Sequence, residues 1–325
     1  MRLVAVTRVL NEDDVVEAFV RHHAPTLVHH IFLDNGSTDR TVEILRALKE
    51  EGLPITVFQN GSVCFFEEAH NTLLYRLAVQ ECAADWVLCL DCDEFIDARG
   101  HEGGPLACLR SMPADAVHGL VEMTNYHPAA TDDTAELLVP RRITMRDRYP
   151  IGVFKCLVRG GPQSQAVTIE AGNHGILLDG QRPEGIHLRS LALAHYPMRS
   201  PARLLVKAVI GRLKVTAAGQ AEVLRGTCSH YTSFMDKMLR DPFELLKNAD
   251  FMENRNGGKD IVEDPILYCG TPLRYTMRDD DVARSIRVLA QYCMALAEHH
   301  GRMLDTYPVL RQDVSAWNCS LNRLM

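Results

Sequence analysis

The sequence lacks long hydrophobic runs, although hydrophobic residues make up 46% of its 325 residues. No stretch approaches the roughly 20 consecutive apolar residues that a membrane-spanning helix needs. Residues 1–14 also lack the apolar centre of a secretory signal peptide, and acidic residues follow at once. We therefore expect a cytoplasmic protein without a transmembrane segment.

Basic residues are not in excess, and the cysteines do not form a compact framework. The formal net charge is -7, which argues against a nucleic-acid partner. Ten cysteines are spread along the chain, as expected for reduced thiols in a cytosol. Cys89 and Cys92 form a C-x-x-C, but no second pair accompanies it. We therefore interpret both as strand side chains rather than as a redox motif.

Glycine-rich nucleotide loops are also missing. The absence of G-x-G-x-x-G disfavours a nicotinamide-dependent dehydrogenase. A nucleotidyltransferase is a closer alternative, but no glycine-rich basic loop follows the first predicted strand.

The most informative segment that is present is Trp86–Ile96, with the sequence WVLCLDCDEFI. Its apolar start predicts a buried strand, which ends in the three carboxylates of Asp91, Asp93 and Glu94. Carboxylates in such a place repel one another, and a divalent cation would hold them together. Asp91 and Asp93 are two residues apart and point to the same side of an extended chain, so the pattern predicts an Mg²⁺ or Mn²⁺ site. The alternative is a helix cap or a solvated loop.

Predicted strands and helices alternate through the first 91 residues. This order indicates a parallel sheet with right-handed crossovers, in which ligands bind beyond the carboxyl ends of the strands. The predicted strands are Leu3–Val6, His30–Leu33, Ile55–Phe58 and Trp86–Leu90, and the predicted helices are Val15–His23, 40–51 and Glu67–Cys82. Polar clusters at residues 7–12, 34–39 and 91–94 fall at the strand ends, so we expect them to share one cleft.

The second half of the chain is less regular and ends in predicted helices. Further strands are predicted at Val117–Asn125, Phe154–Val158 and Ile186–Ala194, and helices at Arg203–Val215, Phe234–Asn248 and Val282–Ala297. The last helix carries an apolar stripe that we interpret as core packing, formed by Ile286, Leu289, Ala290, Cys293, Met294 and Ala297. We therefore predict a catalytic α/β domain over residues 1–200 and a helical region over 201–325.

The ordered set of motifs resembles family 2 glycosyltransferases with the GT-A fold. The motifs are N-E at Asn11, D-N-G-S-T-D at 34–39 and D-x-D at 91–93. More closely, the chain resembles the branch related to the DUF23/family 92 enzymes. That branch shows a histidine pair like His22 and His23, a strand lysine like Lys155, a turn like GNHG at 172–175 and a segment like HYPMRS at 195–200.

The resemblance implies a Rossmann-like, mostly parallel sheet flanked by helices, with a helical C-terminal extension. It also implies transfer of a sugar from a UDP- or GDP-linked donor to a hydroxyl of a glycan, a lipid-linked or a small-molecule acceptor, with inversion favoured. By matching positions, Asp91 and Asp93 would hold Mn²⁺ or Mg²⁺, and His195 would be a late metal ligand. The nucleoside pocket would be lined by Thr7, Asn11, Glu12, Asp34, Asn35 and Ser37.

Three candidates remain for the general base that such a transfer requires. They are His174, Asp179 and Glu184, because the E-D pair and the Q-x-x-R-W motif of the family are not found. Lys155 and Arg199 are candidates for neutralising the leaving diphosphate. A structural turn histidine at 174 and a core histidine at 195 are the alternatives.

Two rival functions remain open besides the nucleotidyltransferase. A strand followed by D-x-D also opens the motif of aspartyl phosphatases, but Phe95 stands where those enzymes carry Thr or Val. A non-catalytic nucleotide-sugar-binding protein is disfavoured by the intact Asp91 and Asp93. The C-terminal helices could cover the acceptor cleft or form a contact in a homo-oligomer.

Overall fold

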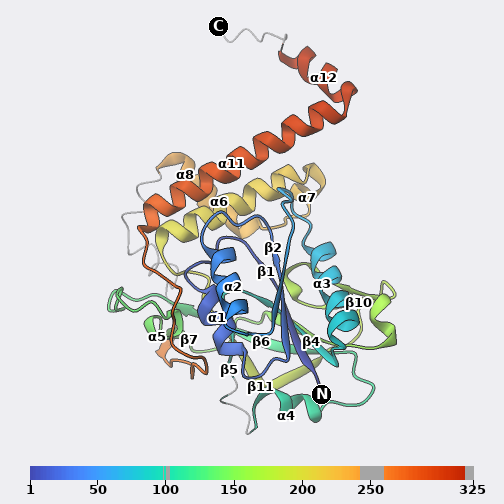
Figure 1. The fold of residues 1–325 in the computed structure, drawn as a ribbon, viewed down its shortest axis with the longest axis vertical. Coiled ribbons are helices and arrows are strands. Elements are labelled where there is room, and N and C mark those ends of the chain that lie inside the picture. Colours follow the sequence, from blue (N-terminus) through green and yellow to red (C-terminus); the bar gives the residue numbers. More distant parts are fainter. Residues whose placement is uncertain (98, 100–102, 242–259, 319–325) are drawn as a thin grey trace.

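A ten-stranded mixed sheet forms the centre of the computed structural model, which describes residues 1–97, 99, 103–241 and 260–318 (Figure 1). Eight of the strands lie in the order β12-β7-β6-β8-β4-β1-β2-β3. Of the other two, β11 pairs with β6, and β5 pairs with β11. Helices cover the sheet, so the predicted α/β class with flanking helices is confirmed.

The first half of the sheet is parallel, as the alternation of strands and helices predicts. Its strands are β1 (Leu3–Val9), β2 (His29–Asp34), β3 (Ile55–Gln59) and β4 (Trp86–Asp91). The connecting helices are α1 (Val16–His23), α2 (Thr41–Glu50) and α3 (Glu67–Cys82). Each of these elements lies within a few residues of its predicted position.

Alternation along the strands creates two cores, one on each face of the sheet. In β1, Leu3 and Ala5 pack into the core that includes α1 and α2, while Val4 and Val6 pack into the core under α3. Successive strand side chains point to opposite faces, so an apolar run of this kind fills both cores at once. The strand is therefore fixed in register from both sides, and its polar end is held at the edge of the sheet.

The second half of the sheet mixes directions. β8 (Phe154–Arg159) lies antiparallel between β4 and β6 (His118–His127), and β11 (Ile186–His195) runs parallel to β6. β5 (Glu94–Asp97) and β7 (Met145–Asp147) pair antiparallel with β11 and β6. The remaining elements of this half are α4 (Gly104–Arg110), α5 (Val139–Arg142) and the small hairpin of β9 (Val167–Ile169) and β10 (Ile176–Leu178).

Most of the C-terminal helices lie at one end of the sheet (Figure 1). They are α6 (Pro201–Ala217), α7 (Gln220–Leu224), α8 (Thr232–Arg240) and α11 (Asp281–Thr306), and α12 (Pro308–Asn318) extends away from the sheet beyond α11. The helix predicted at Phe234–Asn248 corresponds to α8, and its predicted end lies outside the described residues. None of the helices in the described ranges is both long enough and apolar enough to cross a membrane.

The chain beyond residue 200 returns to the sheet. β12 (Ile261–Glu263) pairs antiparallel with β7. Residues 264–280, which we call the strap, then cross α1. The buried carboxylate of Glu17 accepts hydrogen bonds from the backbone N–H groups of Arg274, Tyr275 and Thr276 at 2.7, 2.9 and 2.6 Å. The strap thus ties α11 to the body of the molecule.

The apolar stripe of α11 does not pack into the core, so our interpretation of it is wrong. Ile286 and Met294 are 65% and 60% exposed, Ala290, Cys293 and Ala297 are exposed too, and only Leu289 is partly buried. The buried face is centred instead on Val288 and Tyr292, which pack against α6. The Tyr292 hydroxyl donates a hydrogen bond of 2.7 Å to the carbonyl of Val63, which turns that face inward.

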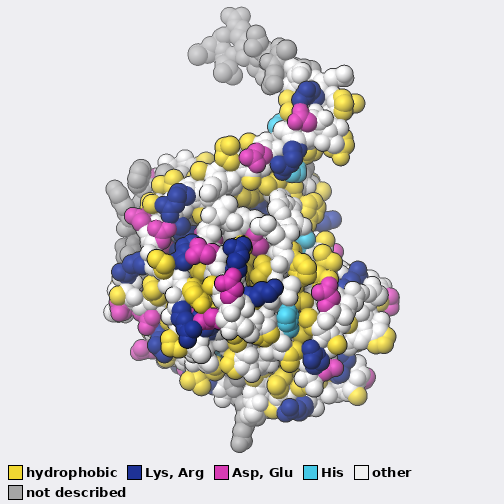
Figure 2. Space-filling model, viewed as in Figure 1, with side chains coloured by type: hydrophobic (Ala, Val, Ile, Leu, Met, Phe, Trp, Pro, Cys, Tyr) yellow, Lys and Arg dark blue, Asp and Glu magenta, His cyan; other side chains and the backbone are white. Residues whose placement is uncertain are grey.

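Charged side chains of opposite sign lie next to one another on the face shown in Figure 2. Many surface contacts of the protein are such pairs, for example Arg40 with Glu43 at 2.7 Å. Ion pairs of this kind are exposed and contribute little to stability. The charges that bear on function are the buried ones at the edge of the sheet.

Candidate active site

The carboxyl ends of several strands meet at one edge of the sheet. β4 ends at Asp91, and the antiparallel β8 begins beside it with Phe154 and Lys155. On the other side His195, the last residue of β11, lies opposite Glu94. The register of the sheet therefore gathers the D-x-D segment, Lys155 and His195 at one place.

Asp91 is paired with a buried lysine. Lys155 Nζ donates to Asp91 Oδ2 at 2.6 Å and lies 3.0 Å from Glu94 Oε1. The Lys155 side chain is only 2% exposed, whereas that of Asp91 is 35% exposed. Burial opposes ionisation of Asp91, but Lys155 and then Arg8 lower its pKa. Burial raises the pKa of Glu94 to about 8, so Lys155 compensates chiefly the negative charge of Asp91.

The two carboxylate oxygens of Asp93 face different partners. Its Oδ2 lies 2.7 Å from Lys207 Nζ and 3.4 Å from Arg199 Nη1. Its Oδ1 faces His195 Nε2 at 3.8 Å. Although burial opposes ionisation, Lys207, His195 and Arg199 lower the pKa of Asp93. The charged carboxylate therefore keeps one oxygen directed at the histidine.

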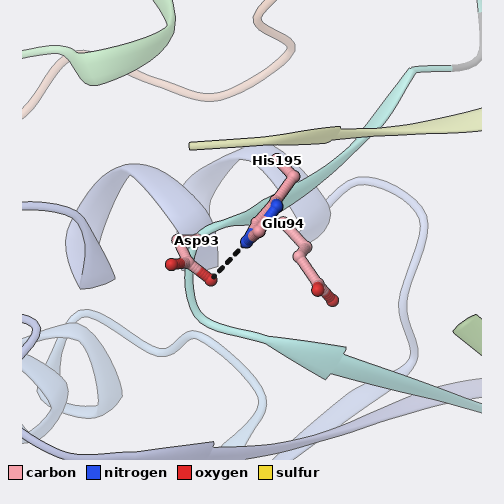
Figure 3. A group of neighbouring side chains, drawn as sticks. All are labelled: Asp93, Glu94 and His195. Atoms are coloured by element: carbon pink, nitrogen blue, oxygen red, sulfur yellow. Dashed lines mark ion pairs between the residues drawn. The ribbon is translucent and has the colours of Figure 1, made fainter. Parts of the chain in front are cut away.

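Asn125 fixes the orientation of the His195 ring. Its Nδ1 lies 2.8 Å from Asn125 Oδ1, and donation along this bond leaves the lone pair of Nε2 facing Asp93. Burial lowers the pKa of His195 to about 4, so the ring is neutral near pH 7. Figure 3 shows the imidazole between the side chains of Asp93 and Glu94.

Asp93, Glu94 and His195 fit a divalent cation. Each offers one ligand atom, and these atoms lie within 4.8 Å of one another. Carboxylate oxygens suit Mg²⁺ and Mn²⁺, and Mn²⁺ also accepts an imidazole nitrogen. Asp91 is not part of this group, because its carboxylate is turned to Lys155.

The histidine pair on α1 holds the segment that follows Glu94. His22 Nε2 lies 2.8 Å from the carbonyl of Ile96, and His23 Nε2 accepts a hydrogen bond of 3.1 Å from the N–H of the same residue. Both rings are buried, and burial lowers the pKa of each. Neutral imidazoles thus hold the N–H and the carbonyl of one residue of β5.

The segments predicted to line the nucleoside pocket are joined by hydrogen bonds. Asn11, in the left-handed conformation with φ 60°, accepts at Oδ1 from the N–H groups of Thr38 and Asp39 at 2.8 and 3.2 Å. Ser37 Oγ accepts from Asn11 N at 2.9 Å. Asp34 is fully buried and accepts from Ser37 N at 3.1 Å and from Gln59 Nε2 at 3.0 Å.

The other donor-side residues are also engaged within the protein. Thr7 is buried and hydrogen-bonded to His30 Nε2 at 2.9 Å. Glu12 pairs with Arg199, and Asn35 Nδ2 donates to the carbonyl of Asn60 at 2.8 Å. The structure therefore brings the donor-side segments together, but Thr7 and Asp34 are closed off by their own partners.

The three candidates for the general base lie in different places. His174 Nδ1 is 2.8 Å from the carbonyl of Phe154, the residue before Lys155 in β8, and its ring is exposed. Asp179 lies at the other end of the hairpin formed by β9 and β10. Glu184 precedes β11 at the end opposite His195. Of the three, His174 is the one that contacts β8 next to Lys155.

Three cations on α6 were missed by the sequence analysis. Arg203, Lys207 and Lys214 lie four and seven residues apart, which places them on one face of the helix. Arg203 pairs with Asp13 at 2.7 Å, Lys207 with Asp93, and Lys214 contacts Asn35. The helical spacing was visible in the sequence, but nothing in it showed which segment this face covers.

Comparisons with known proteins agree with this architecture. Residues 5–100, or 96 of the 325, match the model of the family described as glycosyl transferase family 2. A search of the curated proteins finds no match at the threshold applied. The matched domain makes the chain an enzyme of the glycosyltransferase class, and the mixed α/β architecture is consistent with a GT-A fold.

Solved structures show only a distant likeness. One is S. aureus TarS 1–349, with 11% identity, a TM-score of 0.37 and coverage of 77% of this chain and 76% of that one. Another is glucosyl-3-phosphoglycerate synthase from Mycobacterium tuberculosis in complex with Mg²⁺ and uridine diphosphate. It has 21% identity, a TM-score of 0.23 and coverage of 29% of this chain and 34% of that one. Likenesses at this level do not bear on the chemistry.

Proposed function

We propose that this protein transfers a sugar from a UDP- or GDP-linked donor to an acceptor hydroxyl, with inversion and with the help of Mn²⁺ or Mg²⁺. The observation that carries the proposal is the opposed pair of Asp93 Oδ1 and His195 Nε2 at the carboxyl edge of the sheet. Asp93 lies within residues 5–100, which match glycosyl transferase family 2, and His195 lies beyond them. The acceptor is a glycan, a lipid-linked or a small molecule.

Asp93 and His195, with Glu94 beside them, would hold the cation. Bound there, a divalent ion stabilises the negative charge that grows on the leaving diphosphate. Asn125 fixes the ring of His195, and Lys207 and Arg199 keep Asp93 ionised. Asp91, which is part of the predicted metal site, would join only after a change in its pairing with Lys155.

We propose His174 as the base that removes the proton from the acceptor hydroxyl. Its Nδ1 can donate to the carbonyl of Phe154, which leaves Nε2 as the acceptor of that proton. The ring is exposed, so an acceptor can reach it, and it contacts β8 at the residue before Lys155. Asp179 and Glu184 lie at other ends of their elements, which favours His174 among the three.

We further propose that the chain belongs with the branch related to the DUF23/family 92 enzymes and acts in the cytoplasm. The clamp that His22 and His23 form on Ile96 gives the histidine pair of that branch a physical role. The clamp supports the position of β5 and therefore of Glu94.

Incubation with Mn²⁺ and a panel of nucleotide sugars tests the function. We expect release of UDP or GDP that needs the divalent ion and increases when the right acceptor is added. Release of pyrophosphate from a nucleoside triphosphate would instead favour a nucleotidyltransferase. Binding of a nucleotide sugar without any turnover, across a broad acceptor panel, would favour a binding protein.

A further inference from the structure

The donor side of the site contains a half-buried ammonium group that lacks an acidic partner. Lys214 Nζ contacts the Oδ1 of Asn35, and within the described ranges no carboxylate lies within ion-pairing distance of it. The neighbouring cation Arg8 lowers the pKa of Lys214, pairs with Glu67 and also lowers the pKa of Asp91. Lys214 therefore lies beside a second cation without an ion pair of its own among the described residues.

The position of this pair connects the acidic segment with the predicted nucleoside pocket. Arg8 is the register partner of Asp91 on the neighbouring strand and points to the face covered by α3, where it donates to Asn71 Oδ1 at 2.7 Å. Lys214 approaches from α6 and contacts Asn35, the residue after β2. The two cations thus lie between the end of β4 and the end of β2.

The electrostatics of the pair indicate that an anion binds there. Burial and the neighbouring Arg8 lower the pKa of Lys214 to about 8. Removing a cation from water costs free energy, and so does placing it beside another cation. A bound anion relieves both the desolvation and the repulsion. A phosphate group is suited to the pair, because lysine offers a point charge and arginine a planar fork.

The two cations that the sequence suggested for the diphosphate are already committed. Lys155 pairs with Asp91 and Glu94, and Arg199 pairs with Glu12, Asp14 and Asp93. Their side chains are 2% and 5% exposed. Neither can reach a ligand without leaving an acid unpaired in a buried place.

The spacing of the cations along α6 gives the direction in which a donor would lie. Lys207 is the residue of α6 that contacts Asp93, and Lys214 lies seven residues further along the helix. Seven residues of helix span about 10 Å. A donor held at Asp93 would therefore extend along α6 towards Lys214.

We propose that Lys214 and Arg8 form an anion subsite for a nucleoside diphosphate. This subsite binds the phosphate that is nearer the nucleoside. The assignment rests on the proposed function, and it makes α6 one wall of the donor pocket. The subsite is separate from the metal ligands, so its contribution to binding persists without a divalent ion.

Calorimetric titration of the full chain tests this subsite. The ligands are UDP, GDP, uridine and inorganic pyrophosphate, each with and without Mn²⁺. The variants are Lys214→Gln and Lys214→Arg. The matched control is Arg212→Gln, which removes a cation of α6 that contacts only the carbonyl of Thr227 at 3.4 Å.

We expect Lys214→Gln to weaken binding of the diphosphate by at least about tenfold, as the loss of a hydrogen bond to a charged group implies. The loss should be similar with and without Mn²⁺ and absent for uridine. Lys214→Arg should restore most of the affinity, and Arg212→Gln should bind as the wild type does. Equal binding of the diphosphate by the wild type and Lys214→Gln would overturn the proposal.

The pyrophosphate titration separates this proposal from the proposed function. If the wild type binds neither UDP nor GDP, the proposed function fails. Weaker binding of pyrophosphate by Lys214→Gln than by the wild type would then still establish an anion subsite. Equal binding of pyrophosphate, or none, would overturn the subsite as well.

Discussion

Lys207 Nζ lies 2.7 Å from Asp93 Oδ2 and joins α6 to the turn between β4 and β5. Through this contact a helix of the C-terminal region takes part in the acidic site. The lysine side chain is 35% exposed, whereas that of Asp93 is 2% exposed. The same charge therefore compensates a buried acid and remains within reach of solvent and of any ligand.

The first prediction concerns Asp93. The sequence alone suggests that its removal relieves repulsion between carboxylates, but the structure implies the opposite. Asp93→Asn leaves Lys207 and Arg199 with less compensation, so we expect the free energy of unfolding in urea to fall by about 1–3 kcal/mol. Transfer should fall by about 100-fold or more. Asp115→Asn, an exposed acid, is the control. An Asp93→Asn protein of higher stability would contradict the pairing.

The second prediction concerns the base. In His174→Gln we expect kcat to fall by about 100-fold or more, since general base catalysis contributes that much. The Kd of the donor should not change, because the proposed role of the ring concerns the acceptor hydroxyl. The same measurements on Asp179→Asn and Glu184→Gln decide among the three candidates. A weaker donor affinity with normal turnover in His174→Gln would remove it from this role.

The third prediction concerns pH. Because the pKa of Lys214 is lowered to about 8, its charge is lost as pH rises through that value. Binding of UDP without a metal should therefore weaken between pH 7 and 9. The groups that face Lys214 are Arg8 of β1, Glu67 and His70 of α3, Cys64 and Cys228. In Lys214→Gln the same titration should be flat, and a decline that persists in this variant would assign the effect to one of those neighbours.

The fourth prediction concerns the strap. Glu17→Ala leaves three backbone N–H groups of residues 274–276 without their acceptor and removes one of the two carboxylates that pair with the buried Arg21, the other being Glu51. We expect a loss of about 3–5 kcal/mol in the free energy of unfolding, as for other broken buried pairs. The control is Glu43→Ala, whose carboxylate is exposed and pairs only with Arg40, and it should unfold as the wild type does. Unfolding midpoints that agree between Glu17→Ala and the wild type would rule out an anchoring role.

Burial of Glu17 also gives the strap a pH dependence. Burial opposes its ionisation, but the hydrogen bonds from Arg274, Tyr275 and Thr276 lower its pKa. Stability from a lowered acid pKa is present above the unfolded value and is lost as pH falls through the folded one. The difference in stability between wild type and Glu17→Ala should therefore shrink in acid below the ordinary pKa of a glutamate.

The fifth prediction concerns the exposed stripe of α11. The double variant Ile286→Ser, Met294→Ser should keep the Tm of the wild type, because both side chains already lie in water. Val288→Ser, on the buried face, should lower the Tm. A clear fall in the Tm of the double variant that depends on protein concentration would show instead that the stripe is covered in an oligomer.

The sequence predicted the first half of the sheet well, because local periodicity sets those elements. Trp86 to Leu90 had to be a buried strand, and Asp91 and Asp93 had to lie at its end. The partners of those acids could not be predicted in the same way. Lys207 is 114 residues from Asp93, and only the packing of α6 shows that they meet.

The stripe of α11 shows the corresponding limit for helices. Ile286 and Met294 lie at helical spacing, yet Val288 and Tyr292 offer a second apolar face, and periodicity alone does not choose between them. Packing against α6 buries the second face, and so does the hydrogen bond that the Tyr292 hydroxyl donates to the carbonyl of Val63. Such choices depend on tertiary contacts and not on local pattern.

The pairing of β12 with β7 has a consequence for how the molecule can be divided. A fragment cut at residue 200 would keep β6 and β11 but would leave the outer side of β7 open, with unsatisfied amide and carbonyl groups. It would also keep the carboxylate of Glu17 while losing the donors that surround it. Synthesis on the ribosome would therefore have to pass residue 276 before the α/β part could complete these contacts. Most of its strands are made far earlier.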